Sequence, residues 1–434
     1  MNNKNGKNIF TYLISIGILC ASYYIVCVLS RGEFIQAVFV NDSGDTFMDY
    51  FNSISNAKFN PYTDAYSNYP ALACLLYKVL FRVTPLELRE ADSFILRNVQ
   101  APLIIFILYN FFIIWFVELI IRKRAALDER NGILLSLVIL PSAPFMFTIE
   151  RGNLILLSFA LSFFFVAFYD SESKVLRELS YCSLAVAAAI KIYPALLGML
   201  LVKRKKIKES IRLLVYGITF FIIPFFYYGG IKALKIMLSA LRYTSNLTEE
   251  LGYGVNVSLY NICQTFSEIL NLGISNWHIS IISLAVFSLL VITFFVTQEK
   301  WLEFLSLVLI IILLPKTNYY YVMIFLIIPF VEFVKEWHNG NLRQRIYDIA
   351  FAVIYLIILV PWPLPKVVKL SEGKKYFVSY SMLIHYLAII WLIVFILNKL
   401  LLSVFKNRKY AKICNIIICV VMAIFSLILF LNTL

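Results

Sequence analysis

The chain reads Asn41-Asp42-Ser43-Gly44-Asp45-Thr46-Phe47-Met48-Asp49-Tyr50-Phe51-Asn52 just after its first long apolar run, residues 9–29. This stretch holds three carboxylates within eight positions, in a sequence with only 15% charged residues and a mean hydropathy of +0.82. We therefore expect it to lie just outside a membrane surface. Acidic groups at such a boundary are more often functional than those on an ordinary soluble surface. The hypothesis is that one of them is a catalytic base.

The composition is that of a polytopic membrane protein, because 61% of the 434 residues are hydrophobic and 16% are aromatic. Residues 9–29 have a short basic front and no small-x-small cleavage site, since Arg31 and Glu33 follow, so we expect a retained helix. The net charge of +14 comes from Lys and Arg in short loops between apolar runs. That is the positive-inside pattern, which places the N-terminus in the cytoplasm and argues against nucleic acid as a partner.

The apolar runs predict an all-α integral membrane protein, a bundle of about 13 transmembrane helices in the cell (plasma or inner) membrane. The expected spans are residues 9–29, 99–121, 132–149, 154–169, 179–190, 195–202, 211–228, 277–297, 301–314, 319–334, 346–361, 382–402 and 413–431. Residues 179–190 and 195–202 are each shorter than the roughly 20 residues of a straight span. We interpret them as a broken pair whose free backbone lines a cavity or is covered by protein.

Two modules follow from this pattern. Residues 1–210 contain a first external loop, residues 30–98, and the broken helix pair. Residues 211–434 form a second transmembrane module with a second external loop, residues 229–276.

The external loops are expected to carry helices that lie along the membrane. On a helix, Asp45, Asp49, Asn52 and Asn56 share one stripe, and Phe47, Phe51 and Ile54 fall on the opposite face. This pattern predicts an interfacial helix with its apolar face on the membrane. Residues 69–83 and 230–242 are two further candidates. Such helices would roof a cavity above the bundle, an arrangement that favours an enzyme acting on lipid-linked substrates over a channel.

The acidic stretch has two interpretations. Transfer of a sugar to a hydroxyl needs a base that takes the hydroxyl proton as the new bond forms. Alternatively, Asp42 or Ser43 caps a helix and Asp45 satisfies free N–H groups in its first turn. Asp42 is the best cap candidate. That leaves Asp45 as the expected catalytic base and Asp49 as the second candidate.

Arg151 and Lys191 are cations at the ends of apolar runs, where charge is costly. Arg151 lies in Glu150-Arg151-Gly152-Asn153, which is either an interfacial turn broken at Gly152 or part of a polar cavity. Lys191 follows a helix of small residues and lies on the outer side, against the positive-inside bias. It either snorkels to the interface or holds a phosphate near the outer face. In the lipid-phosphate sugar transfer that the resemblance described below implies, both cations are expected to bind the phosphate of the donor.

Further polar breaks on the same side supply candidate substrate-binding residues. These are Asn153, Tyr193, Asn256 and Lys316.

Metal and nucleotide sites are not indicated. The three His residues are isolated, no Cys/His spacing suggests a metal, and we expect no cofactor. No glycine-rich phosphate loop or nucleotide fingerprint occurs. Of the seven Cys, only Cys74 and Cys263 fall in external segments, and whether they pair is left open.

Three stretches together resemble the GT-C superfamily of multi-spanning glycosyltransferases, and within it glycosyltransferase family 87, which uses polyprenol-phosphate-mannose. They are residues 45–50 followed by Asn60-Pro61-Tyr62 and Tyr69-Pro70; Arg151-Gly152-Asn153 ahead of an apolar helix; and residues 188–194 ahead of a basic run. The resemblance covers about the first 210 residues. It implies inverting transfer of one sugar from a polyprenyl-phosphate donor without an obligate metal. The family's base is an Asp of the first external loop, which Asp45 matches best.

The expected function is therefore transfer of mannose, or another hexose or pentose, to a glycan or glycolipid acceptor on the outer face of the membrane. One alternative is an envelope polysaccharide polymerase or ligase that uses a diphosphate-linked oligosaccharide. Another is a transporter of lipid-linked sugars, which should show broken helices at matched places in both halves. Only one broken pair is indicated by the sequence, which disfavours transport.

Overall fold

The computed structural model describes residues 2–39, 43–246, 255–340, 345–364, 366–369, 377–404 and 408–433. It divides into two compact units, each described here by itself. The first unit comprises Met1–Asn41, Leu127–Pro144 and Thr248–Leu434, and the second unit comprises Asp42–Ala126 and Phe145–Leu247. The module boundary near residue 210 stays a prediction. Asp42, the expected helix cap, lies outside the described residues, as does Asn41.

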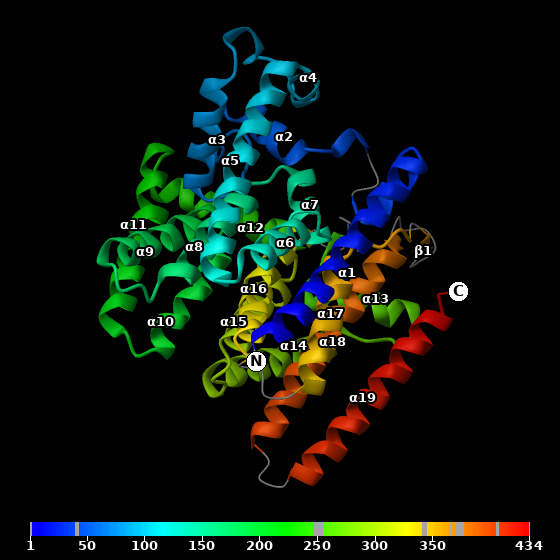
Figure 1. The fold of residues 1–434 in the computed structure, drawn as a ribbon. Helices are drawn as coiled ribbons and strands as arrows, with labels where there is room; N and C mark the ends of the chain where they lie inside the picture. Colours follow the sequence, from blue (N-terminus) through cyan, green and yellow to red (C-terminus); the bar gives the residue numbers. More distant parts are fainter. Residues whose placement is uncertain are drawn as a thin grey trace. The chain divides into compact units, whose positions relative to one another are not determined.

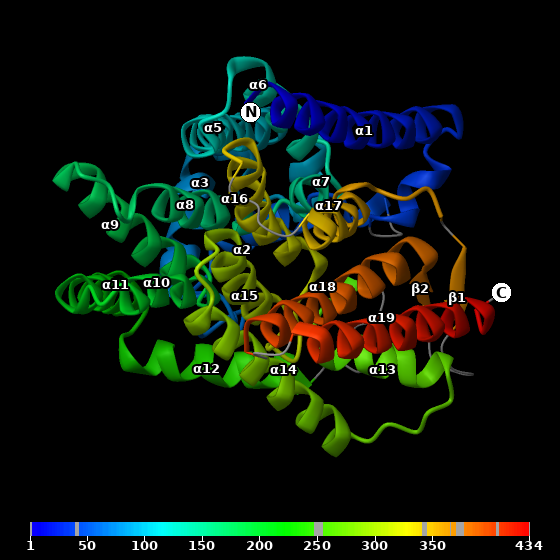
Figure 2. The same ribbon diagram turned by 60° about the horizontal axis from the view of Figure 1, so that its bottom comes forward.

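The first unit is a helical bundle with one short hairpin (Figure 1). Its elements are α1 (Asn2–Leu29), α6 (Glu129–Ile139), α13 (Leu259–Ile269), α14 (Asn276–Val296), α15 (Lys300–Leu313), α16 (Ile327–His338), α17 (Arg345–Leu359), β1 (Val367–Lys369), β2 (Phe377–Ser379), α18 (Tyr380–Val404) and α19 (Arg408–Leu431). The strands β1 and β2 pair antiparallel, with Val368 opposite Val378. The helices α18 and α19 run side by side in both views (Figure 2). Every residue of α15 from Trp301 to Leu313 is buried, as in a helix surrounded by others.

The second unit carries the acidic stretch. Its elements are α2 (Met48–Asn56), α3 (Ala71–Val83), α4 (Ser93–Asn98), α5 (Gln100–Ala125), α8 (Ile155–Phe168), α9 (Lys174–Ile190), α10 (Met199–Lys203), α11 (Ile207–Tyr227) and α12 (Ile231–Asn246), with α7 (Ala143–Arg151) beginning at the unit boundary. The helix α9 packs against α8 and α11, and α2 packs against α3 and α4. The C-terminal Arg122-Lys123-Arg124 of α5 is placed favourably for the helix dipole.

Several helices fit a multi-pass membrane protein. Among the residues that the structure describes, five helices are long and apolar enough to cross a membrane, or six if α6 and α7 count as one broken span. The five are Gly6–Leu29, Gln100–Ala125, Ile207–Tyr227, Asn276–Val296 and Tyr380–Leu402. The count of about 13 stays a prediction.

Two expectations about spans are resolved by the structure. The break between residues 190 and 195 is confirmed, because α9 ends at Ile190 and a 3-10 helix, Tyr193–Gly198, precedes α10. The third expected span, residues 132–149, is interrupted: α6 ends at Ile139 and α7 begins at Ala143, with Pro141 between them. Proline lacks the N–H that a continuous helix requires.

Helices form where the interfacial helices are expected, as α2, α3 and α12, and the position of α3 and α12 along a membrane stays a prediction. The helix α2 differs from the prediction. It begins at Met48, because Phe47 has a left-handed backbone (φ 63°), so Asp45 lies ahead of it in a 3-10 turn, Ser43–Asp45. Asn52 and Asn56 are exposed, as the stripe predicted, whereas Phe51 and Ile54 are buried.

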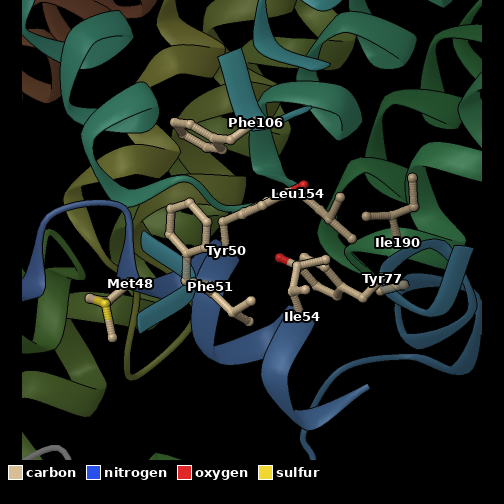
Figure 3. Packing of buried hydrophobic residues seen from close by; sticks show 10 residues of the cluster. Met48, Tyr50, Phe51, Ile54, Tyr77, Phe106, Leu154 and Ile190 are labelled. Atoms are coloured by element: carbon tan, nitrogen blue, oxygen red, sulfur yellow. The ribbon is translucent and has the colours of Figure 1, made fainter. Parts of the chain in front are cut away.

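The apolar face of α2 is covered by protein rather than by membrane. Figure 3 shows Tyr50, Phe51 and Ile54 packed with Tyr77 of α3 and Phe106 of α5. Fully burying a side chain of this size contributes about 2–3 kcal/mol. The placement of this face on the lipid surface is therefore wrong, and the cluster anchors the acidic stretch to the helices around it.

Candidate active site

One arginine joins the two carboxylates. Arg151, at the end of α7, donates through Nη1 to Oδ2 of Asp45 at 2.6 Å and through Nη2 to Oδ1 of Asp49 at 2.5 Å. The side chain of Arg151 is 12% exposed, against 40% for that of Asp45 and 23% for that of Asp49. A planar fork holding two carboxylates fixes their separation and direction. We call Asp45, Asp49 and Arg151 the carboxylate cluster.

The backbone around Phe47 and Gly152 brings the cluster together. The N–H of Phe47 donates to the carbonyl of Glu150 at 2.7 Å, which ties the start of α2 to the end of α7. Gly152 has φ +68°, and a Cβ there would lie 3.0 Å from Cβ of Tyr50. The expected helix break at Gly152 is confirmed, and the close approach of α2 requires it.

Replacing Gly152 with Ala is expected to destabilise the protein by about 2–4 kcal/mol, from the left-handed backbone and the overpacking together. The added methyl would also meet Cε2 of Phe106 at 3.1 Å and the carbonyl of Phe47 at 3.2 Å. Thermal unfolding in detergent measures the effect. The matched control is Gly132→Ala in α6, where nothing lies within 4 Å. Equal melting temperatures for the two variants would refute this account of Gly152.

Arg97 of α4 holds the loop that carries Asp45. Its guanidinium donates to the carbonyls of Gly44 and Thr46. Nothing in the local sequence pattern marks Arg97 as part of the site, since it lies about 50 residues from the loop it holds. It acts as a positioning residue for Asp45.

Asn153 links the carboxylate cluster to Tyr69. Its Nδ2 donates to Oδ2 of Asp49 and to the hydroxyl of Tyr69, each at 3.0 Å. Its Oδ1 accepts from the N–H of Ile155 at 3.1 Å, at the start of α8. Asn153 is 2% exposed, and its amide holds Asp49 in one direction while accepting from the first backbone N–H of α8.

Lys191 lies over the ring of Tyr69. It follows α9 with an extended backbone, and its Nζ is 4.3 Å from the centroid of the Tyr69 ring. Burial away from water lowers the pKa of the Lys191 ammonium to about 8, and the Asp49 carboxylate opposes part of that shift. Tyr193 begins the 3-10 helix that follows and is half-buried. The structure thus brings Asp45, Asp49, Arg151, Asn153 and Lys191 together.

A cavity of about 390 Å³ opens beside α2. Asp49 lies in its wall, with Asn52 and Asn56 from the same helix and Tyr69 and Tyr77 from the next segments. The size suits one or two sugar rings or a small ligand.

Asn256 and Lys316 lie in the first unit, in a polar network of their own. Oδ1 of Asn256 accepts from the N–H groups of Ser258 and Asn318, each at 3.0 Å. The hydroxyl of Ser258 donates to the carbonyl of Lys316 at 2.8 Å, and Nζ of Lys316 lies 5.0 Å from the ring centroid of Tyr260. The substrate-binding roles of both residues stay predictions.

Cysteines and metal ligands add little to the site. Cys74 and Cys263 are both free thiols. Within the described part of the chain, no group of three or more His, Cys, Asp or Glu side chains is arranged to hold a metal ion.

The sequence model of glycosyltransferase family 87 matches residues 69–317 of the chain. The chain belongs to this family. No curated protein and no solved structure matches it. Membership in glycosyltransferase family 87 makes the protein a membrane glycosyltransferase and confirms the resemblance stated above. The match includes Tyr69, Arg151 and Lys191 but begins after Asp45 and Asp49, so it does not cover these two carboxylates.

Proposed function

We propose that this glycosyltransferase moves one sugar, mannose or another hexose or pentose, from a polyprenyl-phosphate donor to a cell-envelope glycan or glycolipid, with inversion. The observation that carries the proposal is the carboxylate cluster, with Lys191 nearby over the ring of Tyr69. The reaction requires a general base for the acceptor hydroxyl, which a carboxylate can supply. It also requires positive charge to stabilise the leaving phosphate, which a lysine can supply.

Asp45 takes the proton of the acceptor hydroxyl as that oxygen attacks the anomeric carbon from the face opposite the phosphate. The bond from the anomeric carbon to the phosphate oxygen breaks, and polyprenyl phosphate leaves with the electron pair. The acceptor oxygen and the phosphate stand on opposite faces, so the anomeric configuration inverts.

We propose Asp45 rather than Asp49 as the base because the two carboxylates differ in how many of their oxygens already accept hydrogen bonds. Both oxygens of Asp49 accept hydrogen bonds, one from Arg151 and one from Asn153. Among the described residues, Asp45 accepts through Oδ2 alone, and its side chain is the more exposed of the two. An open oxygen at a solvent-accessible position suits proton transfer from an acceptor hydroxyl.

Lys191 is the proposed partner of the donor phosphate. The two terminal nitrogens of Arg151 already bind carboxylates. We therefore propose that the main role of Arg151 is to hold the base, and that its contact with the donor phosphate is a secondary role. Asn153, Tyr193, Asn256 and Lys316 are the proposed substrate-binding residues. We further propose that the site opens to the outer face of the cell membrane, with the N-terminus in the cytoplasm.

The lowered pKa of Lys191 predicts that kcat/KM for the donor depends on pH. Because its pKa is lowered to about 8, it is charged below that pH and loses its charge above it. A phosphodiester donor keeps its charge throughout, so kcat/KM for donor should fall about tenfold per pH unit above pH 8. Lys191→Arg should remove this decline, because a guanidinium stays protonated. Superimposable profiles for the two proteins would contradict the role of Lys191.

A donor panel tests the proposed function. Purified protein would be incubated with radiolabelled polyprenyl-phosphate sugars, nucleotide sugars and a diphosphate-linked oligosaccharide, each with a membrane-glycan fraction as acceptor. We expect label to leave a polyprenyl-phosphate sugar only. Transfer from the diphosphate-linked donor would instead favour a polymerase or ligase, and movement of intact lipid-linked sugar across vesicles would favour a transporter.

A further inference from the structure

The cavity beside α2 has an unusual combination of groups for a site next to a phosphate-binding lysine. Its wall includes the amides of Asn52, Asn56 and Asn68 and several tyrosine hydroxyls. Among the described residues that line it, Asp49 is the one charged side chain, and no lysine or arginine is present. A wall of this kind repels a phosphate and suits an uncharged ligand rich in hydroxyl groups.

Tyr69 joins the cavity to the cationic side of the site. Its ring lines the cavity and also lies under Nζ of Lys191, while its hydroxyl accepts from Asn153. A phosphate drawn to Lys191 and a neutral ligand in the cavity would therefore contact the same ring. Asp49 lines the cavity and shares the Arg151 guanidinium with Asp45, so one guanidinium group connects the cavity wall to the proposed base.

Two aromatic rings of the cavity wall are open to solvent. Tyr66 is 73% exposed and Phe59 is 47% exposed. Large apolar surfaces at a pocket commonly mark binding. The C–H face of a sugar ring packs on such rings, while its hydroxyls bond to amides like those of Asn52 and Asn56.

We infer that this cavity binds an uncharged sugar unit of the acceptor, with Tyr66 packing against its ring. The inference rests on the proposed function for the identity of the reaction, but sugar binding by the cavity can be measured without transfer. It names the acceptor class, neutral saccharides, and assigns the donor phosphate to the side of Lys191.

The test uses octyl α-D-mannoside as a neutral probe and octyl β-D-glucuronide as its anionic counterpart. Saturation-transfer NMR on the full-length protein in nanodiscs measures binding without a donor, and transfer kinetics give KM for acceptor and donor separately. We expect the mannoside to bind and the glucuronide to bind at least tenfold more weakly. Tyr66→Ala should raise KM for acceptor about tenfold and leave KM for donor unchanged, and Tyr66→Phe should keep most of the affinity.

The matched control is Tyr243→Ala, an exposed tyrosine of α12 that does not line the cavity. The inference is overturned if Tyr66→Ala behaves like Tyr243→Ala, if it raises KM for donor instead, or if the glucuronide binds as well as the mannoside. Failure of the proposed function looks different: no polyprenyl-phosphate donor would lose label to any acceptor. Binding of the mannoside that depends on Tyr66 would in that case still support the cavity assignment.

Discussion

Asp45→Asn is expected to lower the rate of sugar transfer about 10³-fold, because an amide cannot accept the proton of the acceptor hydroxyl. Asn is nearly isosteric, and its carbonyl oxygen can still accept from Nη1 of Arg151, which holds Oδ2 of Asp45 at 2.6 Å. The loop should therefore keep its place, held also by Arg97. The measurement is the initial rate of label transfer at saturating donor and acceptor.

The variant Asp49→Asn distinguishes the role of Asp49 from that of Asp45. We expect a smaller loss than for Asp45→Asn, because Asp49 has both oxygens in hydrogen bonds and acts through position. The control is Glu90→Gln, which changes another salt-bridged carboxylate of the second unit, one that is 88% exposed and paired with Lys58. A surface pair of this kind contributes little. Full activity in Asp45→Asn with loss in Asp49→Asn would move the base to Asp49.

Arg151→Lys is expected to cost about 10²-fold in transfer while the protein stays folded. A lysine keeps the charge but cannot place two nitrogens against two carboxylates, so Asp45 and Asp49 lose their fixed separation. Arg151→Ala should cost at least as much in transfer. It should also lower the melting temperature, because it leaves two like charges close together without a cation.

The matched control for Arg151→Lys is Arg212→Lys. Arg212 of α11 bridges Glu178 of α9 in the same unit, but with a single carboxylate and 46% exposure. We expect near-normal transfer from it. If Arg151→Lys retained the wild-type rate, the fork would have no part in arranging the carboxylates.

Much of the fold could be predicted from hydrophobic runs. Residues 99–121, 211–228 and 277–297 correspond to α5, α11 and α14 within a few residues, because long apolar segments leave few alternatives. The break after Ile190 was marked by Lys191 and Pro194. Pro141 marked the break between α6 and α7 in the same way, but the hydropathy of the flanking residues hid it.

The start of α2 could not be predicted from residue type. An aromatic residue rarely adopts a left-handed backbone, and Phe47 does so because its N–H bonds to Glu150, a residue about 100 positions away. Helical phasing therefore put Asp45 on α2, where it does not lie. Phe51 and Ile54 were correctly placed on the apolar face of the helix, but their cover is protein and not membrane, which depends on tertiary packing with α3 and α5.

Part of the candidate site could be predicted as a set of residues, but its contacts could not. Asp45, Asp49, Arg151 and Lys191 stand out because charge is costly near apolar runs. Arg151 can bind both carboxylates because of the turn at Gly152 and because Arg97 holds the loop of Asp45. No local sequence pattern reveals either contact. The two polar segments around Asn256 and Lys316 do bond to each other, within the first unit.

The most direct test of the carboxylate cluster as the reaction centre is a single-turnover experiment on protein preloaded with radiolabelled polyprenyl-phosphate mannose. Wild-type protein and Asp45→Asn would be loaded equally in nanodiscs and then mixed with acceptor. The account predicts equal donor binding, rapid loss of label from lipid in the wild type, and label retained on lipid in the variant. Loss of label from Asp45→Asn at the wild-type rate would contradict it.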